Sequence, residues 1–154
     1  MTEERWPLLQ QFVDRAHDYW QLHDGMSYER LLKEIAPELR VAMIAGKLNY
    51  QVGNGGFDQW WANGYGKDRM LGQAVQVLSI VEGEACKKVL GLVGRFGRVV
   101  EEYEESYEDE DDYSTASNDL DTEFYKVNEA FMDEVEAWLR TRETARLAGM
   151  EISL

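Results

Sequence analysis

Apolar side chains recur every three or four residues along most of this chain, which is the spacing of one buried face of an α-helix. The first such run contains Trp6, Leu9, Val13, Ala16 and Trp20. No segment alternates apolar and polar residues as a half-buried strand does, and only two prolines interrupt the 154 residues. The pattern predicts an all-α, single-domain bundle of about six or seven helices over residues 1–154.

Prolines, glycines and polar caps divide these apolar runs into separate helices. Pro7 suits the first turn of the first helix, Ser27 suits an N-cap, and Pro37 ends one helix or starts the next. Residues 53–56, Gly-Asn-Gly-Gly, predict a turn, because three glycines in four positions disfavour a helix. The apolar runs predict helices around residues 6–20, 31–35, 39–50, 57–63, 70–78, 85–107 and 120–138. Residues 108–118 are predicted to form a loop, and the pattern assigns no structure to the tail at 143–154.

Composition limits the compartment. Cys86 is the single cysteine, which rules out an internal disulfide and is typical of a reducing compartment. The opening residues, M-T-E-E-R-W-P, are charged and lack the apolar run of a signal peptide. No stretch approaches the roughly 20 apolar residues that span a bilayer. The sequence therefore predicts a soluble, cytoplasmic protein.

Negative charge is concentrated in one segment. Between Val100 and Tyr125 there are twelve acidic residues and no lysine, arginine or histidine, whereas the rest of the chain holds 18 acidic and 16 basic residues. Such a field repels nucleic acid and membrane surfaces and attracts basic proteins. The densest part supplies the candidate partner-binding residues, which are Glu101, Glu102, Glu104, Glu105, Glu108, Asp109, Glu110, Asp111 and Asp112.

A helix through residues 96–108 would arrange these charges along one side. Phe96, Val99, Val100, Tyr103 and Tyr107 would face the core, and five glutamates would crowd the opposite face. Five charges over about 12 Å approach the density of duplex DNA, which has about seven phosphates in that length. Their mutual repulsion costs on the order of 1–2.5 kcal/mol. The alternative interpretation is a solvated helix face that aids solubility.

Residues that commonly carry chemistry form no recognisable set. His17 and His23 lack metal-ligand spacing and fit partly exposed helix positions. Cys86 fits a small core residue, although the neighbouring lysines could lower its pKa. A calcium loop starting at Asp112 fails at Ala116, which cannot supply a side-chain ligand. We therefore expect no catalytic residues, no metal site and no cofactor, and no enzyme activity.

Two stretches resemble a bacterial all-helical family that was long catalogued as a domain of unknown function. The first is V52-G-N-G-G-F-D-Q-W-W-A-N-G-Y-G66, and the second is the closing helix L120-D-T-E-F-Y-K-V-N-E-A-F-M-D-E-V-E-A-W-L-R140. The similarity covers about residues 30–142. The characterised member of the family is a DNA-mimic protein, so the resemblance implies an acidic protein that occupies the DNA-binding site of a transcription factor.

The first motif suggests a structural role or a pocket. The structural interpretation assigns a turn and an aromatic core to Gly55, Gly56, Phe57, Gln59, Trp60, Trp61 and Asn63. The sharper alternative is a ligand pocket lined by Trp60, Trp61 and Asn63.

Three functions remain open from the sequence. The first is a DNA mimic, or another acidic protein, that binds a basic DNA-binding protein and neither nucleic acid nor membrane directly. The second is an immunity protein that neutralises a basic toxin domain. The third is a small-ligand-binding protein or hydrolase that uses the region of Trp60 and Trp61, and it lacks a catalytic constellation.

Overall fold

The computed structural model describes residues 5–105 and 110–153, and it is a single all-α bundle. Within these residues the chain forms helices and no strands, as the sequence predicts. The elements are α1 (Pro7–Gln21), α2 (Tyr28–Glu34), α3 (Pro37–Ala62), α4 (Arg69–Leu78), α5 (Glu84–Glu105) and α6 (Glu110–Ser153).

The helix starts follow the local signals in the sequence. Pro7 and Pro37 occupy the first turns of α1 and α3, where the missing N–H of proline costs nothing. The Ser27 hydroxyl accepts a hydrogen bond from the backbone N–H of Arg30 at 3.1 Å and caps α2. The N-cap predicted at Ser27 is therefore confirmed.

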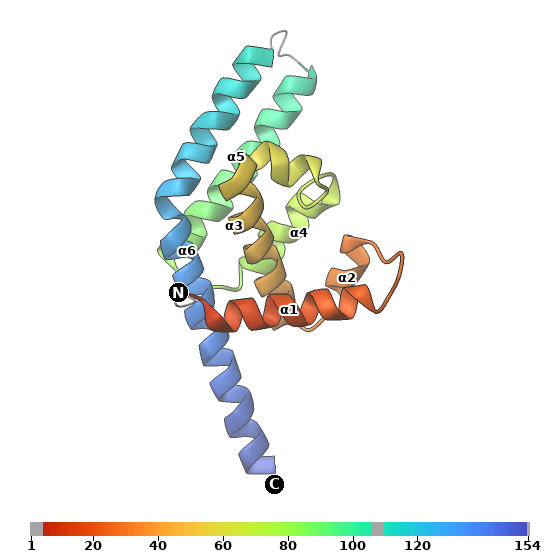
Figure 1. Ribbon diagram of the computed structural model, residues 1–154. Coiled ribbons are helices and arrows are strands. Elements are labelled where there is room, and N and C mark those ends of the chain that lie inside the picture. The colour runs from red at the N-terminus through yellow and green to blue at the C-terminus, as the bar shows by residue number, and fades with distance from the viewer. Residues whose placement is uncertain (1–4, 106–109, 154) are drawn as a thin grey trace.

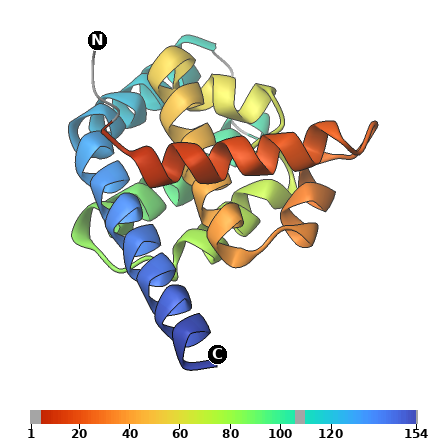
Figure 2. The ribbon, with the colours of Figure 1, turned by 60° about the horizontal axis from the view of Figure 1, so that its bottom comes forward.

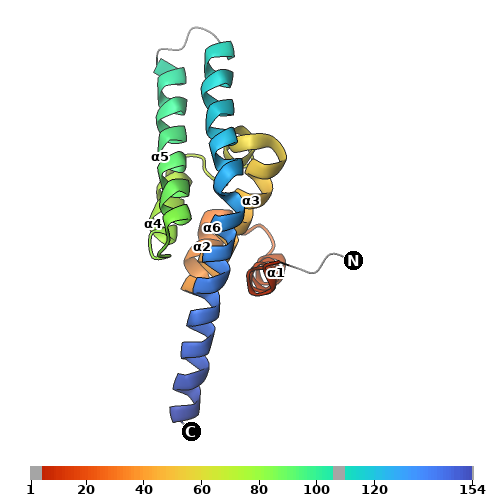
Figure 3. The same ribbon diagram turned by 90° about the vertical axis from the view of Figure 1, so that its left-hand side faces the viewer.

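Helix α6 runs along the whole length of the bundle (Figure 1). Helix α5 runs antiparallel to its N-terminal half, and the two form a hairpin that projects beyond the other helices (Figures 1 and 3). Helix α1 crosses α6 and α3 on another side of the bundle (Figure 2). The C-terminal end of α6 extends past the body at the end opposite the hairpin tip (Figure 1).

An aromatic cluster fills the core where α3, α5 and α6 meet. The ring of Phe57 stacks on Phe96 at a centroid distance of 5.3 Å. It also makes edge contacts with Phe124 at 5.7 Å and Trp60 at 6.2 Å. Trp60 is 1% exposed, so the expected burial of a tryptophan from this motif is confirmed.

The loop predicted at residues 108–118 is wrong for the part that the structure describes, because α6 begins at Glu110. Acidic residues in a first turn interact favourably with the positive end of the helix dipole. Tyr113, Ser117 and Leu120 then lie at helical spacing and pack inward. The other end differs too, since the tail left open by the sequence continues α6 through Ser153.

The turn predicted at residues 53–56 is confined to its last two glycines. Gly53 and Asn54 continue the helix, and the backbone leaves helical geometry only at Gly55 and Gly56, where α3 kinks. Gly56 has φ +80°, a conformation that favours glycine. The aromatic helix predicted at 57–63 is the second half of α3.

Carboxylates of α6 cap the starts of two other helical segments. One is the second half of α3, which starts at the kink, and the other is α1, which has no capping side chain of its own. Asp121 accepts a hydrogen bond from the Phe57 N–H at 2.8 Å, at the start of the second half of α3. Glu136, which is 6% exposed, accepts from the N–H groups of Leu8 at 3.1 Å and Leu9 at 2.9 Å, at the start of α1. These bonds satisfy amides that have no partner within their own helix.

Helix α5 receives the same kind of cap. The carboxylate of Glu134 accepts from the N–H groups of Ala85 at 3.0 Å and Cys86 at 2.7 Å. A side chain added at Gly83 would collide with Glu134, at 2.1 Å from one of its oxygens. Asp121, Glu134 and Glu136 of α6 therefore each accept hydrogen bonds from backbone amides at the start of another helical segment.

Candidate interaction surface

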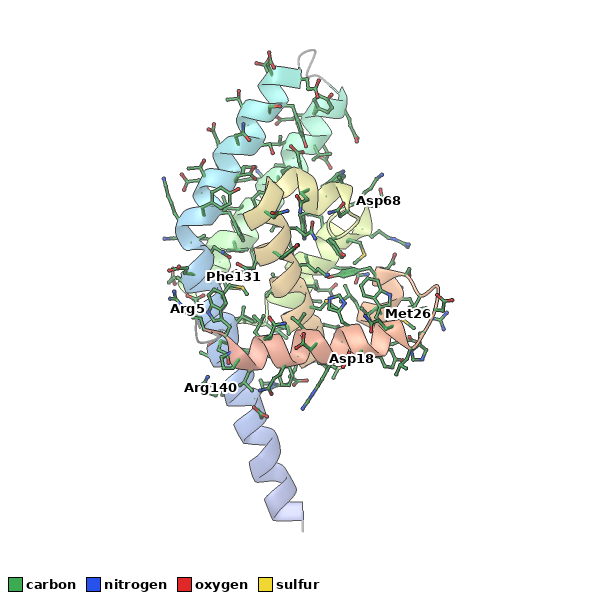
Figure 4. All side chains as sticks on the ribbon, viewed as in Figure 1. Arg5, Asp18, Met26, Asp68, Phe131 and Arg140 are labelled. Atoms are coloured by element: carbon green, nitrogen blue, oxygen red, sulfur yellow. The ribbon has the colours of Figure 1, made fainter. Side chains whose placement is uncertain are left out.

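Six of the predicted partner-binding residues lie together at the end of the α5–α6 hairpin. Three are in the last turns of α5 and three are in the first turn of α6, and all are exposed. The two helix ends are neighbours at the top of Figures 1 and 3, and Figure 4 shows side-chain oxygens gathered there. We call this surface the acidic tip, and it consists of Glu101, Glu102, Glu104, Glu110, Asp111 and Asp112.

The remaining three predicted partner-binding residues are not included in the acidic tip. Glu108 and Asp109 lie outside the described residues, and so does the side chain of Glu105. Tyr107, which the sequence placed on the inner face of α5, also lies outside them.

The inner face of the hairpin follows the predicted apolar stripe. Phe96 is fully buried and Val100 is 7% exposed, whereas Val99 is half-buried. Tyr103 is 38% exposed, and its ring lies 4.5 Å from that of Tyr113 on α6. This ring pair joins the two helices directly beneath the acidic tip.

Asp58 fixes the α6 side of the hairpin to α3. It accepts hydrogen bonds from the hydroxyl of Tyr113 and, at 3.3 Å, from that of Ser117. Burial and the hydrogen bond to Asp58 raise the pKa of Tyr113, so its hydroxyl stays protonated and remains a donor. Asp58 lies within the first sequence motif, but its role cannot be inferred from sequence because the donors are 55 and 59 residues away.

The helix dipole acts in opposite directions on the two halves of the acidic tip. Glu110, Asp111 and Asp112 lie at the positive end of α6 and are stabilised there. The α5 glutamates lie at the negative end of their helix, whose last turn contains no basic residue. Glu101 and Glu104 are also like-charged neighbours at helical spacing. The α5 half of the tip therefore lowers local stability.

The glycines and aromatic residues of the first motif make structural contacts. A side chain at Gly56 would meet the Asp121 carboxylate at 2.2 Å, and one at Gly66 would meet the Trp60 ring at 2.0 Å. Trp61 packs edge-on against Phe96 at 6.0 Å. Gly55 also approaches a side chain closely, since an added Cβ would lie 2.0 Å from the amide oxygen of Gln59.

Two side-chain amides of the same motif form hydrogen bonds to a buried glutamine. Gln59 and Asn63 both donate to the side-chain oxygen of Gln51, at 2.9 and 2.7 Å, and Gln51 is 6% exposed. These contacts are those of a turn and an aromatic core. Of the three residues of the alternative pocket, Asn63 is thus hydrogen-bonded within the protein.

Cys86 lies in the core, and the two histidines lie at exposed or half-buried positions. Cys86 is fully buried, and burial together with Glu134 raises the pKa of its thiol to about 11, opposite to the lowering that nearby lysines could cause. His23 is exposed and hydrogen-bonds the Tyr19 carbonyl at 2.9 Å. His17 is half-buried, and burial and Lys47 lower its pKa.

The described residues contain neither a cluster of metal ligands nor a membrane-spanning helix. Across residues 5–105 and 110–153, no group of three or more His, Cys, Asp or Glu side chains is arranged to hold a metal ion. Over the same part of the chain, none of the helices combines the length and the apolar character that crossing a membrane requires.

The family model of DMP19-like proteins matches residues 33–142. This chain belongs to the DMP19-like protein family. The match includes α3, α4, α5 and most of α6, and therefore the whole acidic tip and both sequence motifs, but it excludes α1. No curated protein and no solved structure matched the chain.

Proposed function

We propose that this protein is a DNA mimic whose acidic tip occupies the DNA-binding surface of a basic protein such as a transcription factor. The observation that carries the proposal is the convergence of six exposed carboxylates from two helix ends on one projecting tip. Membership of the DMP19-like family is consistent with this function. The proposed action is binding without catalysis.

The charge density of the acidic tip supports the proposal. Glu101 to Glu104 span about 4.5 Å of helix, and Glu110 to Asp112 span about 3 Å. Duplex DNA carries one negative charge per about 1.7 Å of axis. Three carboxylates on each of two neighbouring helix ends therefore give a comparable local density. The net charge of −14 adds a long-range attraction that accelerates encounter with a basic partner.

The rigidity of the hairpin supports mimicry over a simple solubility role. The ring contact between Tyr103 and Tyr113 holds the two helices together, and the bond from Tyr113 to Asp58 holds the pair to α3. A charged surface on a fixed scaffold loses little conformational entropy on binding. A device for solubility alone does not require such positioning, and it does not require charges at the unfavourable end of α5.

Competition with DNA tests the proposal. The protein is immobilised, and basic proteins from the source cells that bind to it are eluted with salt and identified. The complex between such a partner and the partner's own DNA site is then titrated with the acidic protein. We expect the DNA to be released as the protein is added. A ternary complex, or a DNA complex that persists at saturation, would contradict mimicry. Identification of a toxin as the partner would instead support an immunity protein.

A further inference from the structure

A cavity separate from the acidic tip lies between α1, α3 and α6. It has a volume of about 400 Å³, within the usual range of small-molecule sites, roughly 300–1,000 Å³. One wall is formed by α1 and the two residues before it, between Arg5 and His17, along the part of the chain that lies between the labelled Arg5 and Asp18 in Figure 4. Because the family match begins at residue 33, this wall lies outside the matched region.

The floor of the cavity is apolar and its rim is aromatic. Leu9, Met43 and Met132 line it and are at most 4% exposed, so they form a firm surface on the core. Trp6 and Tyr50 also line it, and Tyr50 is 66% exposed, which is unusual for a large aromatic side chain. An apolar ligand would cover the exposed aromatic surface of the rim, where aromatic rings contribute a large contact area.

The polar groups on the wall are mainly hydrogen-bond donors. Lys47 is half-buried, its ammonium lies 4.8 Å from the ring centre of Tyr65, and no carboxylate of the described residues forms an ion pair with it. The Asn49 oxygen already accepts a hydrogen bond from Asn128 at 2.6 Å, which leaves the Asn49 amino group as a donor. A half-buried ammonium without a counter-ion favours an anionic ligand.

The other charged groups on the wall are already engaged within the protein. Arg5 is paired with Asp133 at 3.0 Å and with Glu129 at 3.1 Å. Asp14 is exposed and accepts a hydrogen bond from the Gln10 amide at 2.9 Å, so it belongs to the solvent edge. Among the described side chains of the wall, Lys47 is therefore a cation that no carboxylate pairs with.

From these contacts we propose that the cavity between α1, α3 and α6 binds a small apolar molecule that carries a carboxylate. The carboxylate pairs with the Lys47 ammonium, and the Asn49 amino group is a further donor on the cavity wall. The apolar part rests on Leu9, Met43 and Met132 beneath Trp6 and Tyr50. This site is independent of the proposed DNA mimicry, because it uses none of the residues of the acidic tip.

A matched pair of probes tests the site in the full-length protein. 4-Phenylbutyrate and 4-phenyl-1-butanol share an apolar body and differ in the carboxylate. Binding is followed by the NMR shifts of backbone amides and of the Trp6 indole N–H. We expect saturable shifts confined to the cavity residues with 4-phenylbutyrate, and binding of the alcohol weaker by at least about tenfold, which is the worth of one charge-assisted hydrogen bond.

Two lysine variants identify the charge responsible. Lys47→Met removes the ammonium and keeps an unbranched stem that can contact Tyr65, and it should abolish the preference for the acid over the alcohol. Lys67→Met removes an exposed lysine elsewhere and should leave that preference unchanged. Absence of saturable shifts, equal binding of the two probes, or an unchanged preference in folded Lys47→Met would each overturn the proposal.

Discussion

The carboxylate of Asp121 accepts a hydrogen bond from the backbone N–H of Phe57 at 2.8 Å, across 64 residues of sequence. The kink at Gly55 and Gly56 leaves the first amides of the following helical segment without partners in their own helix. Asp121 satisfies one of them and fixes the kink to α6. The same stretch of α6 leads directly to the acidic tip, so the kink helps to set the position of that surface.

Replacing Asp121 with alanine should lower the free energy of unfolding by about 1–3 kcal/mol, because a partly buried amide loses its acceptor. Asp121→Asn keeps an acceptor oxygen and should cost less. Asp119→Ala, an exposed site two residues earlier, is the matched control and should change stability little. Urea denaturation measures all three. Equal effects at positions 119 and 121 would show that the cap contributes nothing.

Two glycines of the same motif should respond in opposite directions to alanine. Gly53 is helical and open, with nothing within 4 Å of an added Cβ, so Gly53→Ala should stabilise the protein by about 0.4–1 kcal/mol. Gly56 has φ +80°, and a Cβ added there would collide with the Asp121 carboxylate, so Gly56→Ala should destabilise the protein by at least about 1–3 kcal/mol. Thermal or urea unfolding distinguishes them, and a stabilising Gly56→Ala would refute this backbone at the kink.

The thiol of Cys86 should be unreactive in the folded protein. It is fully buried with its pKa raised to about 11, so it is protonated and covered at pH 8. A disulfide reagent should label it slowly in buffer and rapidly in urea. Rapid labelling of the native protein would contradict its place in the core.

The raised pKa of Cys86 also predicts a pH dependence of stability. The folded protein favours the neutral thiol, so its contribution is fully present below the ordinary pKa of 9.0 and is lost as pH rises toward about 11. The difference in unfolding free energy between the wild type and Cys86→Ala should therefore shrink over that interval. A difference that grows with pH would mean that the thiolate is the favoured form.

Helix identity could be predicted from sequence because it depends on local spacing. The apolar stripe from Phe96 to Val100 and the cap at Ser27 needed only near neighbours. The loop prediction failed because the stabilisation of early α6 is not local. Tyr113 and Ser117 are held by Asp58, which lies more than 50 residues away. A polar, acidic segment without such partners resembles a loop.

The candidate sites also differ in whether their residues are close together in the sequence. The acidic tip could be recognised because its residues are adjacent in sequence, although the meeting of two helix ends required the fold. The cavity of Lys47 and Asn49 could not be recognised, since its wall combines α1, α3 and α6 in a pattern without sequence spacing. Capping by Glu134 and Glu136 was equally hidden, because a glutamate on a helix surface resembles any solvated residue.

We expect the acidic tip, and not net charge alone, to bind the partner. One variant neutralises four acids of the tip: Glu101→Gln, Glu104→Gln, Glu110→Gln and Asp112→Asn. The control neutralises four exposed acids elsewhere: Asp18→Asn, Asp24→Asn, Asp68→Asn and Glu82→Gln. In Figure 4, Asp18 lies on the side of the body away from the tip, and Asp68 lies on the body outside the tip. Both variants carry the same net charge.

The deciding measurement is the affinity of each variant for the isolated basic partner at physiological ionic strength, where charges are screened within about 8 Å. We expect the tip variant to bind at least about tenfold more weakly, mainly through slower association, while the control stays close to the wild type. Equal affinity of the two variants, whether both are weakened or neither is, would contradict this expectation.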